Sequence, residues 1–174
     1  MESRLKIALF GGSFNPIHAG HVGIAEKAIA EWALDRVLFI PAKMNPFRVG
    51  EQVAGGFTDA ERWDFVVRVC AANPKFEAWD VDLKRAEGPS YAINTVRAAM
   101  ARFPGASFFW IIGEDNIAGL PKWKDWETLQ TLCRFIAYPR TRESSTEIRR
   151  RLLVGESVAE FLPKSIADKL TGHF

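Results

Sequence analysis

Short apolar runs recur along the chain, and their lengths are typical of buried β-strands. Four of them are continuous, whereas a fifth alternates between apolar and polar positions. The continuous runs cover residues 7–10, 37–40, 108–112 and 135–138, and the alternating run covers residues 76–83. We expect each of the five to form a strand.

Helical periodicity occupies the stretches between these runs, because apolar residues recur there at every third or fourth position. The clearest sets are Val22, Ala25, Ile29, Trp32 and Ala33; Trp63, Val66, Val67 and Cys70; and Ile93, Val96, Met100 and Phe103. Continuously apolar strands that alternate with helices indicate a parallel sheet covered on both faces. The expected fold class is α/β, a doubly wound parallel sheet that binds ligands beyond the carboxyl ends of its strands.

The composition fits one ordinary globular domain over residues 1–174. Apolar residues make up 48% of the chain and charged residues 25%, and 23 basic against 21 acidic residues leave a net charge of +2. This balance gives no reason to expect nucleic acid or a membrane as a partner. No stretch reaches the ~18 apolar residues of a membrane span, and the N-terminus does not resemble a signal peptide. The cytoplasm is therefore the expected location, and a homo-oligomer remains open.

Several side chains that are capable of catalysis or ligand binding are interpreted as structural. Cys70 and Cys133 form neither a CxxC pair nor a zinc-ligand spacing, so both are expected to be buried thiols. Trp110 lies inside an apolar run and is expected in the core. Asp80 and Asp82 alternate along the fifth run, and we interpret them as the solvated edge of a strand. The long irregular stretch 42–56 is either a substrate loop or a plain surface connection.

The most informative segment follows the first apolar run and covers residues 11–21, GGSFNPIHAGH. Gly11 and Gly12 let the backbone approach a ligand closely. The helix that follows offers unpaired N–H groups and a positive dipole end, which suit phosphate. The segment matches neither GxGxxG nor GxxxxGK(S/T), so the dehydrogenase and P-loop interpretations lose their main support.

His18 and His21 lie three positions apart at this helix start, so both imidazoles fall on one face. They could donate hydrogen bonds to the same phosphate. The helix dipole is expected to lower their pKa values, and a bound triphosphate to raise them. A zinc site is not expected, because no third ligand completes the set.

A second helix start lies near the other end of the chain, at residues 144–151, SSTEIRRR. Ser144 and Glu147 have the spacing of a capping box. One interpretation is an N-cap followed by a solvated basic face. The other is a second phosphate site, built from hydroxyls, free N–H groups and arginines. Two such helix starts in one small domain fit a triphosphate better than a single phosphate.

Together the two segments resemble the signatures (T/S)FxPxHxGH and SxTxxR of the nucleotidylyltransferase superfamily. Further matches are similar to the bacterial nicotinate mononucleotide adenylyltransferases, namely Gly88-Pro89-Ser90-Tyr91, Ile111-Ile112-Gly113-Glu114-Asp115 and Trp123. The resemblance implies a Rossmann-like fold. It also implies transfer of the adenylyl group of ATP to nicotinate mononucleotide, which releases pyrophosphate and forms deamido-NAD in NAD biosynthesis.

The resemblance also assigns residue roles. His18, His21 and Arg149 would be catalytic, with His21 the main stabiliser of the transition state. The residues implied to bind ATP are Gly11, Gly12, Ser13, Phe14, His18, His21, Gly113, Asp115, Ser145, Thr146 and Arg149. Tyr91 and Trp123 would hold the pyridine nucleotide, and Arg48 would meet the acceptor phosphate. Mg²⁺ would arrive with ATP, since no carboxylate cluster would bind it independently.

The chain departs from the family pattern in three places. The usual Pro-Pro-His-(Lys/Arg) is replaced by Asn45-Pro46-Phe47-Arg48, the Thr that commonly follows Ser-Tyr is Ala92, and the stretch before Ser144 is shorter by some tens of residues. These departures keep other acceptors in view, such as nicotinamide mononucleotide or phosphopantetheine. They also keep in view a nucleotide-binding regulatory protein that has lost turnover.

Overall fold

The apolar runs of the sequence supply the strands of one parallel sheet. The computed structural model describes residues 3–43, 45–47, 49–85 and 88–171. Among these residues the strands are β1 (Lys6–Gly12), β2 (Arg36–Pro41), β3 (Phe76–Ala78), β4 (Ser107–Gly113) and β5 (Arg134–Tyr138). Their order is β3-β2-β1-β4-β5, and every neighbouring pair is parallel. The predicted α/β, doubly wound, Rossmann-like fold is confirmed.

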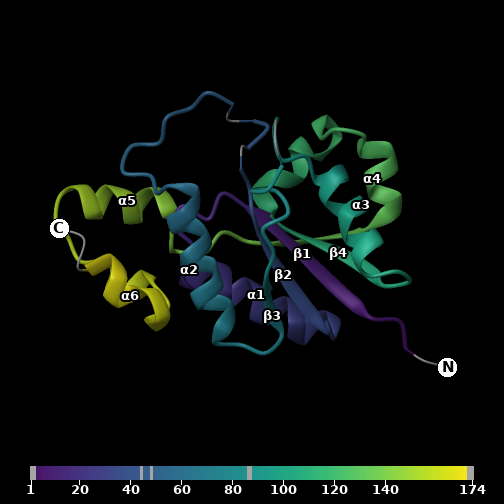
Figure 1. Cartoon of the computed structure of the whole chain (residues 1–174), viewed down its shortest axis with the longest axis horizontal. Coiled ribbons are helices and arrows are strands. Elements are labelled where there is room, and N and C mark those ends of the chain that lie inside the picture. Colours follow the sequence, from purple (N-terminus) through teal and green to yellow (C-terminus); the bar gives the residue numbers. More distant parts are fainter. Residues whose placement is uncertain (1–2, 44, 48, 86–87, 172–174) are drawn as a thin grey trace.

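Helices cover both faces of this sheet (Figure 1). The α-helices of the described residues are α1 (Ala19–Trp32), α2 (Asp59–Ala71), α3 (Ala92–Arg102), α4 (Trp126–Leu132), α5 (Ser145–Leu153) and α6 (Lys164–Thr171). Two 3-10 helices are η1 (Glu114–Lys122) and η2 (Ala159–Phe161). The sequence pattern predicted α1, α2, α3 and the start of α5, but not η1, α4 or α6. No helix in the described ranges is both long and apolar enough to cross a membrane.

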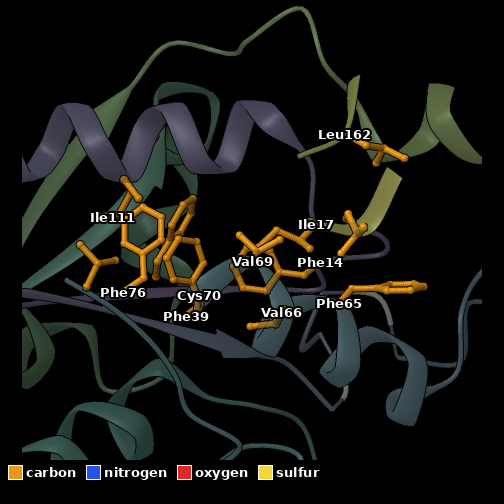
Figure 2. Packing of buried hydrophobic residues seen from close by; sticks show 14 of the residues in the cluster. Phe14, Ile17, Phe39, Phe65, Val66, Val69, Cys70, Phe76, Ile111 and Leu162 are labelled. Atoms are coloured by element: carbon orange, nitrogen blue, oxygen red, sulfur yellow. The ribbon is translucent and has the colours of Figure 1, made fainter. Parts of the chain in front are cut away.

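Two apolar clusters form the core, one on each face of the sheet. Alternate residues of β1 separate the two, since Ala8 and Phe10 join one cluster and Ile7 and Leu9 the other. The first cluster packs under α1, α2, α5 and α6, and Figure 2 shows its aromatic and aliphatic side chains in contact. The second packs under α3 and α4. Both cysteines are buried thiols, as predicted, and burial raises each pKa to about 12.

The fifth apolar run forms a much shorter strand than predicted. Residues 76–83 were expected to be extended, but β3 ends at Ala78 and the chain turns, with the Lys84 N–H donating to the Asp80 carbonyl. The interpretation of Asp82 as part of a solvated edge is also wrong. Asp82 is 4% exposed, and its side chain accepts a hydrogen bond of 2.9 Å from the Thr95 hydroxyl of α3. The polar residue Asp82 in this alternating run is therefore buried beneath a turn, where it contacts Thr95.

The strand order places the reversal of the sheet between β1 and β4. From β1 the chain builds outward to β2 and β3, and it then crosses back to place β4 on the other side of β1. The loops that leave the carboxyl ends of β1 and β4 therefore diverge to opposite faces and leave a crevice between them. That crevice is where a ligand is expected.

Candidate active site

A cavity of about 800 Å³ lies at the carboxyl ends of β1 and β4. Its walls come from the β1–α1 loop, the segment after β2, the start of α3, η1 and the start of α5. The predicted site residues that line it are Gly11, Gly12, Ser13, Phe14, His18, His21, Tyr91, Gly113, Asp115, Trp123, Ser145, Thr146 and Arg149. Arg48 lies outside the described residues, so its contact with an acceptor phosphate stays a prediction.

The loop after β1 holds a residue in a strained backbone conformation. Phe14 has a φ of 44°, in the left-handed region that side chains disfavour by ~1–2 kcal/mol. Its ring is 2% exposed and packs against the rings of Phe10, Phe39 and His21 at centroid distances of 5.5, 5.9 and 5.0 Å. Such strain persists only where the surroundings enforce it, and it concentrates at binding sites.

The glycine at position 11 makes room for an aromatic ring of the protein. A Cβ there would lie 2.9 Å from Cζ2 of Trp110, closer than real Cβ atoms approach any neighbour. Trp110 therefore occupies the space that a side chain at position 11 would need, while Gly11 itself lines the cavity. Trp110 is buried, as predicted for a core residue, and its ring also borders the cavity.

His18 and His21 stack on each other, with ring centroids 3.7 Å apart. The Nδ1 atom of His18 accepts a hydrogen bond from the Gly20 N–H, and Nδ1 of His21 accepts one from the His18 N–H, each at 3.1 Å. Because both Nδ1 atoms are acceptors, each neutral ring carries its proton on Nε2. The first turn of α1 thus prepares two Nε2–H donors side by side.

Both imidazoles are neutral in the free protein near pH 7. Burial lowers the pKa of His18 to about 4, although the nearby Glu143 carboxylate acts in the opposite direction. Burial also holds the pKa of His21 well below its usual range, and the neighbouring His18 adds to this. The predicted direction is confirmed, but its main cause is desolvation. A bound polyanion would oppose that effect.

Gly20, between the two histidines, is required by close packing. A Cβ at this position would collide with the Thr141 hydroxyl oxygen and would lie 3.0 Å from the His18 ring. Thr141 belongs to the segment between β5 and α5. The glycine of the HxGH sequence therefore allows the two ends of the site to come together.

The start of α5 packs directly on the β1–α1 loop. The Ser145 hydroxyl donates to the Pro16 carbonyl at 2.9 Å, and Nη1 of Arg149 donates to the Asn15 carbonyl at 2.6 Å. Only half of the predicted capping box forms, because the Ser144 hydroxyl accepts from the Glu147 N–H while the Glu147 carboxylate pairs with Arg150 and Arg151. The two helix starts that the sequence singled out form one wall of the cavity.

The side of the cavity at the end of β4 carries a paired carboxylate. Nε and Nη2 of Arg140 lie 2.9 and 2.7 Å from Oδ2 of Asp115. A Cβ at Gly113 would lie 2.6 Å from Oδ1 of Asp115, so this glycine leaves room for the carboxylate. Arg140 is largely exposed and can release Asp115 to a ligand hydroxyl.

Comparison with known proteins agrees with this geometry. The pattern of the cytidylyltransferase-like family matches residues 9–152, a range that contains both helix starts and most of the cavity lining. This chain belongs to that family.

Three relatives within the family carry the same name. A protein of Thermus thermophilus named a probable nicotinate-nucleotide adenylyltransferase is 34% identical, over 97% of this chain and 98% of its own length. A Methylacidiphilum infernorum protein of the same name is 31% identical, over 92% and 87%. A Synechococcus relative, also of that name, is 38% identical over 78% of this chain, but the match spans only 63% of that relative. This family member thus groups with the nicotinate-nucleotide adenylyltransferases.

Two solved structures share the fold. A putative nicotinate-nucleotide adenylyltransferase from Vibrio parahaemolyticus superposes with a TM-score of 0.74 at 20% identity, covering 95% of this chain and 98% of that one. The nicotinic acid mononucleotide adenylyltransferase of Plasmodium falciparum, complexed with NaAD, gives 0.72 at 14% identity and covers 98% and 96%. These likenesses support the fold of this family member.

One part of the cavity lining is aromatic and carries positive charge. Trp123 stands edge-on to Trp110 and Phe135, with centroids 6.0 and 5.8 Å away. Nζ of Lys124 lies 4.6 Å from the centroid of the Tyr91 ring. Lys124 makes no ion pair with a carboxylate in the described part of the chain. Trp123, Tyr91 and Lys124 thus make this part of the cavity aromatic and cationic.

Two of the positions that depart from the family pattern, Phe47 and Ala92, border this cavity. Phe47 is 61% exposed, and its N–H donates to the Asn45 side chain at 2.9 Å. Ala92 begins α3, whose first turn has no side-chain cap, and the N–H groups of Asn94 and Thr95 donate to the Tyr91 carbonyl at 3.1 and 3.3 Å. Part of the irregular stretch 42–56 therefore lines the cavity.

Sequence reasoning missed three residues that shape the cavity. Lys124 adjoins the predicted Trp123, and its charge could have singled it out. Asp82 lines the cavity from beneath the turn after β3. Arg62 is buried on α2 beneath the β1–α1 loop, and a helical pattern that places an arginine on the apolar face was the available signal.

Metal-binding groups do not gather in this site. Within the described ranges, no three His, Cys, Asp or Glu side chains are arranged to hold an ion. The polar groups that line the cavity include imidazoles, hydroxyls and the starts of α1 and α5.

Proposed function

We propose that this protein transfers the adenylyl group of ATP to the phosphate of nicotinate mononucleotide, releasing pyrophosphate and forming deamido-NAD. One observation carries the proposal above all others. Two helix starts from opposite ends of the chain, each with groups suited to phosphate, line the same cavity, which also has an aromatic and cationic part. Triphosphate and pyridine nucleotide could therefore lie in one continuous site.

The reaction needs no protein nucleophile. An oxygen of the acceptor phosphate forms a bond to the α-phosphorus of ATP, while the bond from that phosphorus to the bridging oxygen of the β-phosphate breaks. The electron pair leaves with pyrophosphate. Catalysis then consists of aligning two anions and stabilising the charge that develops on the leaving group.

The histidine pair suits that task. Its two Nε2–H donors are fixed by backbone contacts and would bind the ATP phosphates, with His21 the main stabiliser of the leaving pyrophosphate. Ser145, Thr146 and Arg149 would bind the triphosphate from the α5 side, and the remaining N–H groups of the β1–α1 loop would complete the site. Gly113 and Asp115 would meet the adenosine, with the carboxylate available to its ribose.

Magnesium enters this scheme as a companion of ATP. The described residues hold no carboxylate cluster, so the ion would keep phosphate oxygens and water as its main ligands. It would neutralise charge on the β- and γ-phosphates. The chain would recognise the phosphates of the complex.

Lys124 supports nicotinate as the preferred acceptor. Nicotinate carries a carboxylate where nicotinamide carries a neutral amide. An ammonium group beside the Tyr91 ring, with no ion pair to a described carboxylate, complements that charge at the aromatic end of the cavity. Tyr91 and Trp123 would bind the ring itself.

Product analysis with purified protein tests the proposal. ATP and Mg²⁺ are incubated with nicotinate mononucleotide, nicotinamide mononucleotide or phosphopantetheine, and dinucleotide and pyrophosphate are quantified. We expect equal amounts of deamido-NAD and pyrophosphate, and less product from nicotinamide mononucleotide. If phosphopantetheine were the only one of the three acceptors to give product, it would be assigned as the acceptor in place of a pyridine mononucleotide. ATP binding without product from any acceptor would support a regulatory protein.

A further inference from the structure

Arg62 is a buried cation that the function described above does not use. It lies in the first turn of α2, a helix fixed at its start by a full capping box between Thr58 and Glu61. Its side chain is 6% exposed. An arginine is rarely buried without several acceptors, so its partners are informative.

The guanidinium joins the ends of two neighbouring strands. Nη1 of Arg62 donates to the Ser13 carbonyl, just after β1, and Nη2 donates to the Ala42 carbonyl, just after β2, at 2.8 Å. Nη2 also lies 2.7 Å from the Asp59 carboxylate, which is half-exposed. Beside this contact, the Ala42 N–H donates to the Gly12 carbonyl at 2.8 Å. Arg62 therefore fixes the β1–α1 loop against the segment that follows β2.

This contact sets the orientation of one peptide group. The bond between Ser13 and Phe14 is trans, and the carbonyl and N–H of a trans peptide point in opposite directions. Because the Ser13 carbonyl points at Arg62, the Phe14 N–H points away from Arg62. No described residue accepts a hydrogen bond from that N–H.

Phe14 needs such a constraint. Its φ of 44° is disfavoured, so the loop would relax to another conformation unless both its ring and its peptide were held. The ring is held by burial, whereas the peptide is held by Arg62. Ser13 and Phe14 both line the cavity.

We propose that Arg62 is a positioning residue, which orients the peptide between Ser13 and Phe14 so that the Phe14 N–H binds a phosphate oxygen of ATP. The inference rests on the proposed function for the identity of the ligand. Arg62 itself does not touch ATP. It acts through a backbone carbonyl, and the same guanidinium ties the ATP loop to the segment that approaches the acceptor.

The test compares Arg62→Met and Arg62→Lys with the matched variant Arg68→Met. Arg68 lies on the same helix, and its side chain and that of its partner Asp64 are equally exposed. The control therefore removes the same type of charge, but from the helix surface and not from the interior. Thermal unfolding first establishes that each variant is folded at the assay temperature. ATP affinity is then measured by calorimetry without acceptor, and kcat and KM are measured with acceptor.

We expect Arg62→Met to weaken ATP binding by about tenfold, the size of one lost hydrogen bond to a charged group. We expect kcat to fall as well, while KM for the acceptor changes little. Arg62→Lys should recover part of the loss, because an ammonium group reaches one carbonyl. Arg68→Met should bind ATP within about twofold of the wild type, as a surface pair allows.

A spectroscopic measurement separates positioning from folding. In ¹⁵N-phenylalanine-labelled protein, the Phe14 amide resonance should shift on addition of ATP in the wild type and Arg68→Met, and less in Arg62→Lys. If Arg62→Met does not fold, Arg62→Lys decides the matter. The inference would be overturned if a folded Arg62 variant bound ATP with wild-type affinity and showed the same ATP-induced shift of the Phe14 amide as the wild type. Failure of wild-type protein to make a dinucleotide, with ATP binding intact, would overturn only the proposed function.

Discussion

The Ser145 hydroxyl donates a hydrogen bond to the Pro16 carbonyl over 2.9 Å, across 129 positions of sequence. With Arg149 and Asn15 it joins the helix start near the C-terminus to the loop after the first strand. The polar groups of both segments border one cavity as a consequence. Charge on a ligand that spans both helix starts would be stabilised from two sides.

Replacing His21 should slow the chemistry without unfolding the protein. His21→Ala removes one prepared Nε2–H donor, and we expect kcat to fall by roughly 10², the scale of one lost transition-state donor. His21→Gln can place an amide N–H near the Nε2 position and should retain more activity than His21→Asn, which cannot reach it. Steady-state kinetics with saturating ATP measures this order. Equal rates for wild type and His21→Ala would contradict the role of the imidazole.

Acid should destabilise the free protein through the buried histidines. The folded-state pKa of His18 is about 4, below its unfolded value of 6.5, so the unfolded state binds more protons between these values. Stability is therefore full above about pH 6.5 and falls as the pH drops, by about 2 kcal/mol at pH 5 and about 3 kcal/mol at pH 4 from His18 alone. His21 acts in the same direction. Urea unfolding at pH 7.5 and pH 5 measures the change.

The matched variant for this effect is His18→Asn. Asparagine is a good N-cap, so its side chain can still accept from the Gly20 N–H, but it does not titrate. The free energy of unfolding of His18→Asn should depend less on pH than that of the wild type. The same pH dependence in both proteins would show that His18 is not the group responsible.

Removing the charge of Lys124 should change acceptor choice more than rate. Lys124→Met keeps an apolar stem beside Tyr91, and we expect kcat/KM for nicotinate mononucleotide to fall by about fivefold, as for one partly exposed ion pair. The value for nicotinamide mononucleotide should stay constant. Lys27→Met is the control, since Lys27 also lies over a tyrosine ring, that of Tyr138, but outside the cavity. An unchanged ratio of the two kcat/KM values in Lys124→Met would argue against charge recognition.

The close contact at Gly20 gives a prediction about coupling. Gly20→Ala places a methyl group against the Thr141 hydroxyl and the His18 ring, so we expect a lower melting temperature and a lower kcat. Thr141→Ala removes the nearer obstacle and should cost little by itself. In the double variant the loss of stability should be smaller than the sum of the two single losses. Additive losses of stability would show that the added methyl group collides with a group other than the Thr141 hydroxyl.

Local patterns in the sequence determined the classes of structure and the main motifs. The apolar runs predicted the strands, and the periodic stretches predicted α1, α2 and α3. Burial against a sheet or on one helix face produces a regular spacing of apolar residues along the sequence. The segment from Gly11 to His21 was informative for a similar reason, since two glycines, a helix start and two imidazoles follow one another within eleven residues. Its resemblance to a superfamily signature then indicated the chemistry.

The tertiary structure decided which segments meet. The position of β4 beside β1 brings α5 against the β1–α1 loop, and nothing in the spacing of residues 15 and 149 encodes that contact. The same holds for Asp82, whose partner Thr95 lies on another element, and for Arg62, whose partners are carbonyl groups of two loops. Backbone carbonyls are identical at every position, so only the fold shows which of them a buried charge will meet.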